Sequence, residues 1–320
     1  MRARSGLSIF CLVLTCCGAR SEIRGGLPDA AADDDVTADA APPACSNVGV
    51  IVQTGTLPDT IVLDGSYVYW HEQSGLFRAL KSGGGAPEQV ADATSSFWPD
   101  LAAFAIGGGG HLFYGEYPYA MYDDTPIETF SSPGFGASGS HVFMWSRDEL
   151  PSPLVRFDLF SGIPTAIGTI ARKPVEMTFA QPEVMCIAED PGVECGGQLL
   201  SGLTATDLVA TAKDVWFTSN DPTNGARVMH IELPSAKVTP IADTQGALAI
   251  AGDETTLFFT DTEGRRVRRI DGKTGPVSDV ASVGNQLTPV DVVMDDTCVY
   301  WTNASLAPDA PGVVMAAPKK

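Results

Sequence analysis

The stretch IVLDGSYVYW at residues 61–70 returns as VVMDDTCVYW at residues 292–301, and five degraded copies lie between them. When each copy is aligned at the end of its second hydrophobic stretch, the copies fall at seven positions: Trp70, Tyr114, Met144, Cys186, Phe217, Phe259 and Trp301. The intervals are 44, 30, 42, 31, 42 and 42 residues. A period near 40 residues is typical of an array of one supersecondary unit, so the sequence predicts a repeat architecture.

Each copy has the same parts in the same order. A first apolar strand ends in a turn of Asp, Gly or Ser, as at Asp64-Gly65-Ser66 and Asp295-Asp296-Thr297. The second strand carries an aliphatic column followed by a column of aromatic residues or Met: Val68, Leu112, Val142, Val184, Val215, Leu257 and Val299, then Tyr69, Phe113, Phe143, Met185, Trp216, Phe258 and Tyr300. Adjacent strand residues face opposite sides of a sheet, so two apolar columns indicate that both faces are covered.

A third strand follows in most copies, as at residues 76–80, and a fourth strand is visible in several, as at residues 88–91. Four antiparallel strands per repeat around an axis form a β-propeller. We therefore predict an all-β protein, a β-propeller of seven blades, with six blades as the alternative because two intervals are short. The last copy ends after its third strand at residues 313–316, so we predict that residues 48–53 join the last blade and close the ring.

The first 17 residues have the pattern of a secretory signal. Arg2 and Arg4 precede the apolar stretch Leu7–Leu14, which is too short to span a bilayer. The end of this segment, Leu14-Thr15-Cys16-Cys17, resembles a bacterial lipobox. That resemblance implies a lipoprotein signal peptide at residues 1–17 and a lipid on Cys17, with Cys16 as the alternative; an ordinary signal peptide that contains cysteines is the simpler interpretation.

Two further segments complete the predicted organisation. Residues 18–47 are rich in Ala, Asp and Pro and too poor in apolar residues to fold, so we predict a disordered tether. Residues 48–320 form the propeller. Gly18 after the lipidated cysteine resembles an outer-membrane sorting signal, so we expect an exported protein that is lipid-anchored to the bacterial envelope, at the outer membrane.

The formal net charge is −19. Phosphate recognition needs clustered Lys and Arg, so this charge argues against nucleic acid and against anionic lipid surfaces as partners. We expect membrane contact only through the lipid anchor, and we expect a monomer.

Four cysteines remain outside the signal segment: Cys45, Cys186, Cys195 and Cys298. An exported chain meets an oxidising compartment, and an even count predicts two disulfides. Cys186 and Cys195 flank the turn-rich sequence AEDPGVE, so they would join locally. Cys45 and Cys298 would join the two ends of the ring. Zinc is the rival, but no CxxC and no histidine at ligand spacing accompany these residues, so we predict no metal there.

The loops between the second and third strands must emerge on one face of a propeller, and they are acidic. The candidate ligand face consists of Glu72, Glu116, Asp148, Glu189, Asp221 and Asp261. Carboxylates in a ring suit a cation, an amine or a sugar. Alternatively, these acids bond turn amides or a neighbouring blade. We predict no cofactor, with a divalent cation such as calcium as the alternative.

The sequences Tyr69-Trp70-His71, Phe259-Thr260-Asp261 and Tyr300-Trp301-Thr302-Asn303 resemble the Tyr-Trp-Thr-Asp repeat of lipoprotein-receptor propellers. The whole unit is equally similar to the propeller repeats of exported bacterial lipoproteins and of virginiamycin B lyase. The resemblance covers about residues 48–320 and implies blades. It implies no activity, because propellers host many unrelated functions.

No nucleophile elbow, phosphate loop, dinucleotide glycine signature or HExxH motif is present. The first strands are mostly apolar, which leaves few polar groups facing the axis, and no catalytic residue is predicted. We therefore expect a binding or scaffold module for a protein or glycan at the cell envelope rather than an enzyme. The alternative is a lyase or lactonase-type propeller enzyme with its site at the central channel.

Overall fold

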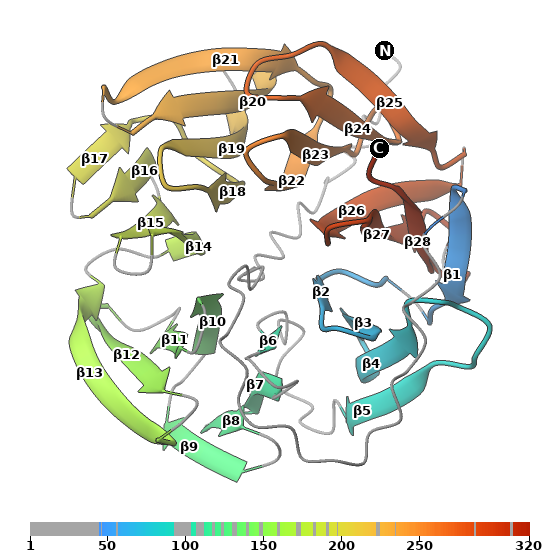
Figure 1. Ribbon diagram of the computed structural model, residues 1–320. Coiled ribbons are helices and arrows are strands. Elements are labelled where there is room, and N and C mark those ends of the chain that lie inside the picture. The colour runs from blue at the N-terminus through green and yellow to red at the C-terminus, as the bar shows by residue number, and fades with distance from the viewer. Residues whose placement is uncertain are drawn as a thin grey trace, which may run out of the picture.

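The computed structural model describes residues 45, 47–55, 57–92, 104–106, 112–116, 119–122, 125–129, 133–138, 141–146, 150–158, 161–170, 174–181, 184–189, 192–196, 198–221, 225–233, 235–284, 286–307 and 310–320. All regular elements in these ranges are β-strands, and their sheets stand around one axis (Figure 1), which confirms the predicted all-β propeller. The predicted signal peptide, the lipidation site at Cys17 and residues 18–44 and 46 of the predicted tether lie outside the described residues. In the part that is described, no helix has the length and apolar character needed to cross a membrane.

The described strands form seven four-stranded antiparallel sheets, which we number in chain order. In sheets 1 to 6 the first strand lies nearest the axis and the fourth at the rim (Figure 1). Sheets 1 to 3 contain β2 (Ile61–Leu63), β3 (Tyr67–Glu72), β4 (Gly75–Leu80) and β5 (Glu88–Asp92); β6 (Phe104–Ile106), β7 (Leu112–Glu116), β8 (Tyr119–Tyr122) and β9 (Thr125–Thr129); and β10 (Pro133–Ser138), β11 (His141–Ser146), β12 (Ser152–Asp158) and β13 (Ile163–Ile170).

Sheets 4 to 6 contain β14 (Pro174–Gln181), β15 (Val184–Glu189), β16 (Gly192–Cys195) and β17 (Gln198–Ser201); β18 (Asp207–Ala210), β19 (Asp214–Asp221), β20 (Gly225–Glu232) and β21 (Lys237–Asp243); and β22 (Ala247–Gly252), β23 (Thr256–Asp261), β24 (Arg266–Asp271) and β25 (Val277–Ser282). Sheet 7 is assembled from both ends of the chain. It combines β26 (Leu287–Met294), β27 (Cys298–Ser305) and β28 (Val313–Pro318) with β1 (Gly49–Gln53), which pairs antiparallel with β28.

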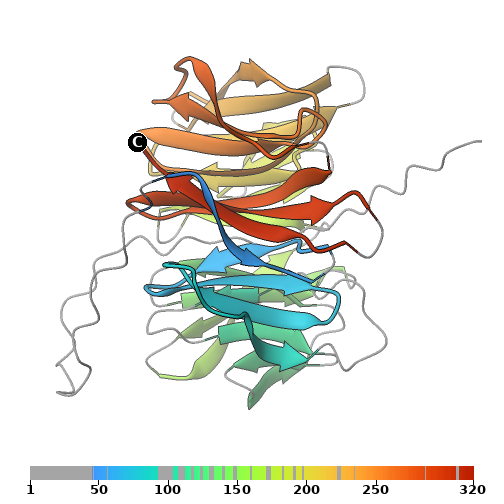
Figure 2. The same cartoon turned by 90° about the vertical axis from the view of Figure 1, so that its right-hand side faces the viewer.

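The ring has two faces, seen edge-on in Figure 2. The turns that join first to second strands lie on one face, which we call the lower face. The turns that join second to third strands lie on the other, the upper face. In sheets 1, 5, 6 and 7 the lower turns all have three residues: Asp64–Ser66, Thr211–Lys213, Asp253–Thr255 and Asp295–Thr297. The upper turns differ in length, from Gln73–Ser74 in sheet 1 to Thr262–Arg265 in sheet 6 and Leu306–Gly312 in sheet 7.

The core lies between neighbouring sheets. Trp301 of β27 is fully buried in a cluster with residues of sheet 6, and Trp70 of β3 is fully buried in a cluster with residues of sheet 7. The next column, represented by Tyr300, faces the opposite way and contacts the following sheet. Both columns are therefore buried because each sheet is covered on two sides, as the sequence predicts.

Sheet 4 departs from the predicted columns. Cys186 was aligned with Trp70, whose side chain faces the preceding sheet, but Cys186 packs in the cluster between sheets 4 and 5. Ile187 packs instead in the cluster between sheets 3 and 4. The alignment of this copy is wrong by one residue, and because side chains alternate along a strand, a shift of one residue exchanges the two faces.

A threonine in three successive sheets bonds each sheet to the next. Thr218, Thr260 and Thr302 follow the aromatic columns of β19, β23 and β27 and are fully buried. Their hydroxyls donate to the carbonyls of Leu248, Val290 and Asp59, at 3.1, 3.5 and 3.0 Å. Leu248 and Val290 lie within the first strands of the following sheets, β22 and β26, and Asp59 lies just before β2. The Thr of the Tyr-Trp-Thr-Asp-like sequence therefore holds neighbouring sheets together near the axis.

Thr302→Val is expected to lower the free energy of unfolding by about 2 kcal/mol, because the buried carbonyl of Asp59 loses its donor while the shape of the side chain is kept. Thr302→Ser keeps the hydroxyl and should lose much less. Urea unfolding followed by circular dichroism measures both values. Equal losses for the two variants would assign the effect to the methyl group instead.

Lysines that follow third strands clasp the lower face. Each reaches an aspartate of the preceding sheet: Lys81 Nζ lies 3.0 Å from Asp295 Oδ2, Lys319 Nζ lies 2.5 Å from Asp253 Oδ2, and Lys273 pairs with Asp214. Burial alone would raise the pKa of Asp295, but the amides of Thr297 and Cys298 and the Lys81 ammonium together lower it. On the lower face, the same type of lysine–aspartate ion pair thus joins three sheets to the sheets that precede them.

The N-terminal segment is tied to sheet 7 at several points. Beyond the β1–β28 pairing, the Thr54 amide donates to Gly312 O at 3.0 Å and the Gly312 amide donates to Gly55 O at 2.9 Å. A disulfide joins Cys45 to Cys298 at the start of β27. The second predicted disulfide, Cys186–Cys195, joins directly opposite residues of β15 and β16. Both predicted pairings are confirmed.

Candidate functional site

The described predicted ligand acids lie on the upper face, at the ends of second strands. Five of the six are the last residues of their strands: Glu72, Glu116, Glu189, Asp221 and Asp261. The sixth, Asp148, lies outside the described residues, as do the side chains of Glu116 and Glu189. Asp221 is half-buried. Glu72 and Asp261 are buried between sheets, so their environments can be followed in detail.

Asp261 holds two turns together from a fully buried position. Its Oδ1 accepts the amide of Gln245, in the segment that leaves sheet 5, at 3.1 Å, and the amide of Gly264, in its own turn, at 3.2 Å. Its Oδ2 lies 3.3 Å from Arg266 Nη2 and 3.7 Å from Arg268 Nη1. These contacts join the turn after β23 to the segment that leaves sheet 5, which corresponds to the second of the two roles that the sequence left open for these acids.

Glu72 occupies the same position in sheet 1 and faces the segment that leaves β1. It is 4% exposed, and a Cβ added at Gly55 would come within 2.6 Å of its Oε2. Ser74 Oγ lies 3.5 Å from Oε1, whereas Oε2 is buried without a hydrogen-bond partner. Burial raises the pKa of Glu72, and the Asp59 carboxylate adds to the rise, against the opposing effects of the Gly55 amide, Ser74 and His71. A carboxyl group whose ionised form is disfavoured by burial therefore lies beside the segment that leaves β1.

Glu72→Gln is expected to stabilise the protein at neutral pH. The pKa of Glu72 in the folded protein is raised above its unfolded value, so the fold favours the protonated carboxyl. The stability that this preference contributes is fully present below the unfolded pKa, near 4.3. It is lost as the pH rises through the folded pKa. The side-chain amide of the glutamine variant does not ionise, so the variant does not lose this stability as the pH rises. Thermal unfolding of both proteins between pH 5 and 8 should give a higher Tm and a flatter pH profile for the variant; parallel profiles would contradict the assignment.

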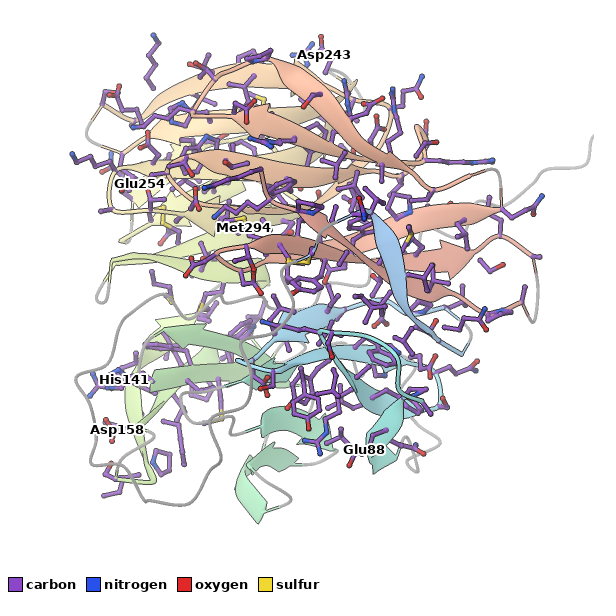
Figure 3. All side chains as sticks on the ribbon, turned by 45° about the vertical axis from the view of Figure 1, so that its right-hand side comes forward. Glu88, His141, Asp158, Asp243, Glu254 and Met294 are labelled. Atoms are coloured by element: carbon purple, nitrogen blue, oxygen red, sulfur yellow. A yellow bond between two sulfur atoms is a disulfide. The ribbon has the colours of Figure 1, made fainter. Side chains whose placement is uncertain are left out.

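Three of the four histidines lie in described segments, and each pairs with an aspartate of its own sheet. Asp59, just before β2, brackets His71 Nδ1 with both carboxylate oxygens at 3.0 and 3.1 Å. His230 Nε2 lies 2.7 Å from Asp214 Oδ1, and its ring stacks on Trp216. His141 Nε2 lies 3.3 Å from Asp158 Oδ2, on sheet 3 (Figure 3). His111 lies outside the described residues.

These His–Asp pairs were not predicted from the sequence, because the partners are 12 to 17 residues apart and lie in different segments of their sheets. A lysine one or two residues after a third strand was the available signal for the clasps on the lower face, since Lys81, Lys273 and Lys319 recur there. In the described part of the chain, no three His, Cys, Asp or Glu side chains converge in a way that could hold a metal ion.

No protein-family model matches the chain, and no curated protein sequence does. Solved structures do match. The WD40 domain of Pan2 from Neurospora crassa aligns with a TM-score of 0.63 at 10% identity, over 86% of this chain and 96% of that one. The extracellular domain of a putative hybrid two component system from B. thetaiotaomicron gives 0.60 at 11% identity, over 84% of this chain and 39% of that one.

PorZ, a bacterial surface component of the type-IX secretion system of Porphyromonas gingivalis, gives a TM-score of 0.56 at 11% identity, over 84% of this chain and 39% of that one. At identities this low, likeness to a solved structure establishes a shared fold and leaves function open. The fold of this chain is that of a β-propeller.

Proposed function

We propose that the protein is an exported binding or scaffold module, anchored to the bacterial envelope by a lipid on Cys17, that recognises a protein or glycan with its upper face. The observation that carries the proposal is the contrast between the two faces. The lower turns of sheets 1, 5, 6 and 7 have one length and share the lysine clasps, whereas the upper turns differ in length and chemistry. Loops that vary on a rigid frame are typical of binding surfaces.

The proposed architecture is a monomeric ring in which each of the seven sheets is one blade and β1 closes the ring. The pairing of β1 with β28 and the Cys45–Cys298 disulfide support this closure. Disulfides form and persist in oxidising compartments, which supports export. Two of the similar structures are an extracellular domain and a bacterial surface component, in agreement with such a location.

Within the upper face, the buried acids Glu72 and Asp261 serve the fold, so any ligand acids would come from Glu116, Asp148, Glu189 and Asp221. We propose no cofactor, and calcium is the cation to test. Isothermal titration of the purified protein with calcium, and a glycan array with and without calcium, examine both ligand classes. Saturable binding that is lost with Asp221→Asn but kept with a lower-face change such as Asp64→Asn would support the upper face. Loss through Asp64→Asn instead would reject it.

The anchor has a separate test. Labelling of producing cells with radioactive palmitate should mark the wild-type protein and the Cys16→Ser variant, whereas Cys17→Ser should abolish the label, because the lipid is attached to the first residue after cleavage. Label retained by Cys17→Ser and lost by Cys16→Ser would move the cleavage site by one residue. An unlabelled wild-type protein would exclude a lipid anchor.

A further inference from the structure

β1 is the outermost strand of sheet 7, and it is held along one edge. It pairs with β28, and in the described part of the chain no strand lies on its other side (Figure 1). Val52 is the one buried side chain of β1, whereas Val50 is 56% exposed. A strand with one hydrogen-bonded edge and little buried surface offers the least resistance when the chain that leads into it is pulled.

The disulfide fastens the chain before β1 begins. Cys45 precedes Gly49, the first residue of β1, and is bonded to Cys298, the first residue of β27, with the two Cα atoms 5.9 Å apart. Both strands begin at the lower end of the sheet. A pull on the chain before Cys45 therefore reaches Cys298 through the sulfur atoms. Residues 46–48 are not stretched as long as Cys45 stays beside Cys298.

β27 is held more firmly than β1. It lies between β26 and β28, pairs with both, and its first six residues are buried. The Cys298 amide donates to Asp295 Oδ1 at 2.8 Å, and the Asp295 amide donates to the Cys298 carbonyl at 2.9 Å. Movement of β27 would have to break hydrogen bonds to strands on two sides and expose Trp301. A pull at Cys298 thus meets resistance from the interior of sheet 7.

We propose that the Cys45–Cys298 disulfide is a mechanical clamp that carries tension from the N-terminal segment into β27 and keeps it off β1. This inference rests on the proposed lipid anchor, because an anchored chain transmits to Cys45 any pull that a bound partner exerts on the upper face. The role differs from the effect of the disulfide on the free energy of unfolding, which arises from the unfolded chain. Forced unfolding follows the unfolding rate, and that rate depends on which strand is loaded first.

Single-molecule force spectroscopy tests the clamp on the purified full-length protein. One handle is attached at Thr37, in the N-terminal segment, and the other at Glu263, an exposed residue on the upper turn of sheet 6. Both positions carry an azide-bearing unnatural amino acid, so no new cysteine is introduced. The pull then runs from the N-terminal segment to the upper face, as it would between an anchor and a bound partner.

The measurement is made in a Cys186→Ser/Cys195→Ser background, so that of the two disulfides only Cys45–Cys298 can be reduced. Before reduction we expect one rupture without an earlier extension. After reduction an extension of about ten residues, roughly 35 Å of chain, should come first, at less than half of the rupture force, because β1 then peels from β28. Each molecule is folded before it is reduced and serves as its own control.

A change within β1 separates the clamp from ordinary stabilisation. Val52→Ala removes a buried contact of β1 with the cluster that contains Trp70 and Tyr300. With the disulfide intact, the variant should rupture at the same force as its parent, because β1 is not loaded. After reduction, its early extension should occur at a lower force than in the parent. A lower force with the disulfide intact would show that β1 carries the load in spite of the disulfide.

Two other outcomes reject the clamp. An early extension of the same length before reduction would mean that β1 peels although the disulfide is closed. An unchanged trace after reduction would mean that the pairing with β28 withstands the pull alone. The lipid anchor is judged separately by palmitate labelling: an unlabelled protein with a reduction-dependent extension would keep the clamp and remove the anchor, and a labelled protein without that extension would do the reverse.

Discussion

Replacing Cys45 and Cys298 together by serine is expected to lower the free energy of unfolding by about 5 kcal/mol. The disulfide spans 253 residues, and in the chain-entropy model the stabilisation grows with the logarithm of the closed loop. Its removal frees the unfolded chain and leaves β1 held by its pairing with β28 and by the bonds between Thr54, Gly55 and Gly312. Guanidinium unfolding monitored by circular dichroism measures the loss.

The second disulfide supplies the matched control. Cys186 and Cys195 are only 9 residues apart, so the same model predicts a loss of about 2.5 kcal/mol for their double serine variant. Equal losses for the two variants would contradict an origin in loop length. Peptide mapping without reduction should recover Cys45 joined to Cys298, and free thiols at both positions would remove the basis of the prediction.

Trp301→Ala is expected to lower the free energy of unfolding by about 3–5 kcal/mol, because it empties a large site that neighbouring residues cannot fill. Trp301 is fully buried, and it packs against Ala249, Phe258 and Val267 of sheet 6 as well as Val292 of its own sheet. The loss should therefore weaken the contact between sheets 6 and 7 and reduce the cooperativity of unfolding. Thermal and guanidinium unfolding curves measure both effects.

Trp301→Phe is the control for this prediction. The indole Nε1 of Trp301 is buried without a hydrogen-bond partner, so phenylalanine removes volume without breaking a bond. Its loss should be well under half of that for alanine. If the phenylalanine variant were destabilised as strongly as the alanine variant, the indole nitrogen would have a role that packing does not explain.

Much of the fold follows from the repeated phrase itself. The turn after the first strand of sheets 1, 6 and 7 was readable because the carboxylate of its leading Asp bonds to amides that follow it closely in the chain. Asp295 Oδ1 accepts the amides of Thr297 and Cys298 at 2.9 and 2.8 Å, two and three residues on. The two apolar columns were readable because side chains alternate along a strand. The alignment failed by one residue at Cys186, where the copy has no aromatic residue to mark which position faces the preceding sheet.

Less of the candidate site could be predicted from the sequence. The sequence placed Glu72 and Asp261 correctly at the ends of second strands, but it could not tell whether they faced solvent or a neighbouring sheet. That distinction depends on Gly55 and Gln245, which approach from the segments leaving the preceding sheets. Contacts of this kind join residues that no local pattern connects.

The sequence by itself determined the all-β repeat, the propeller, the order of strands and both disulfide pairings, because periodicity, turn chemistry and cysteine position are local or countable properties. Only the tertiary structure decided which side chains meet between neighbouring sheets: the threonine bonds, the lysine–aspartate pairs on the lower face and the buried carboxyl of Glu72. The physical reason is that a propeller places each strand end beside a different copy of the repeat. The environment of a residue there depends on its neighbour's sequence as much as on its own.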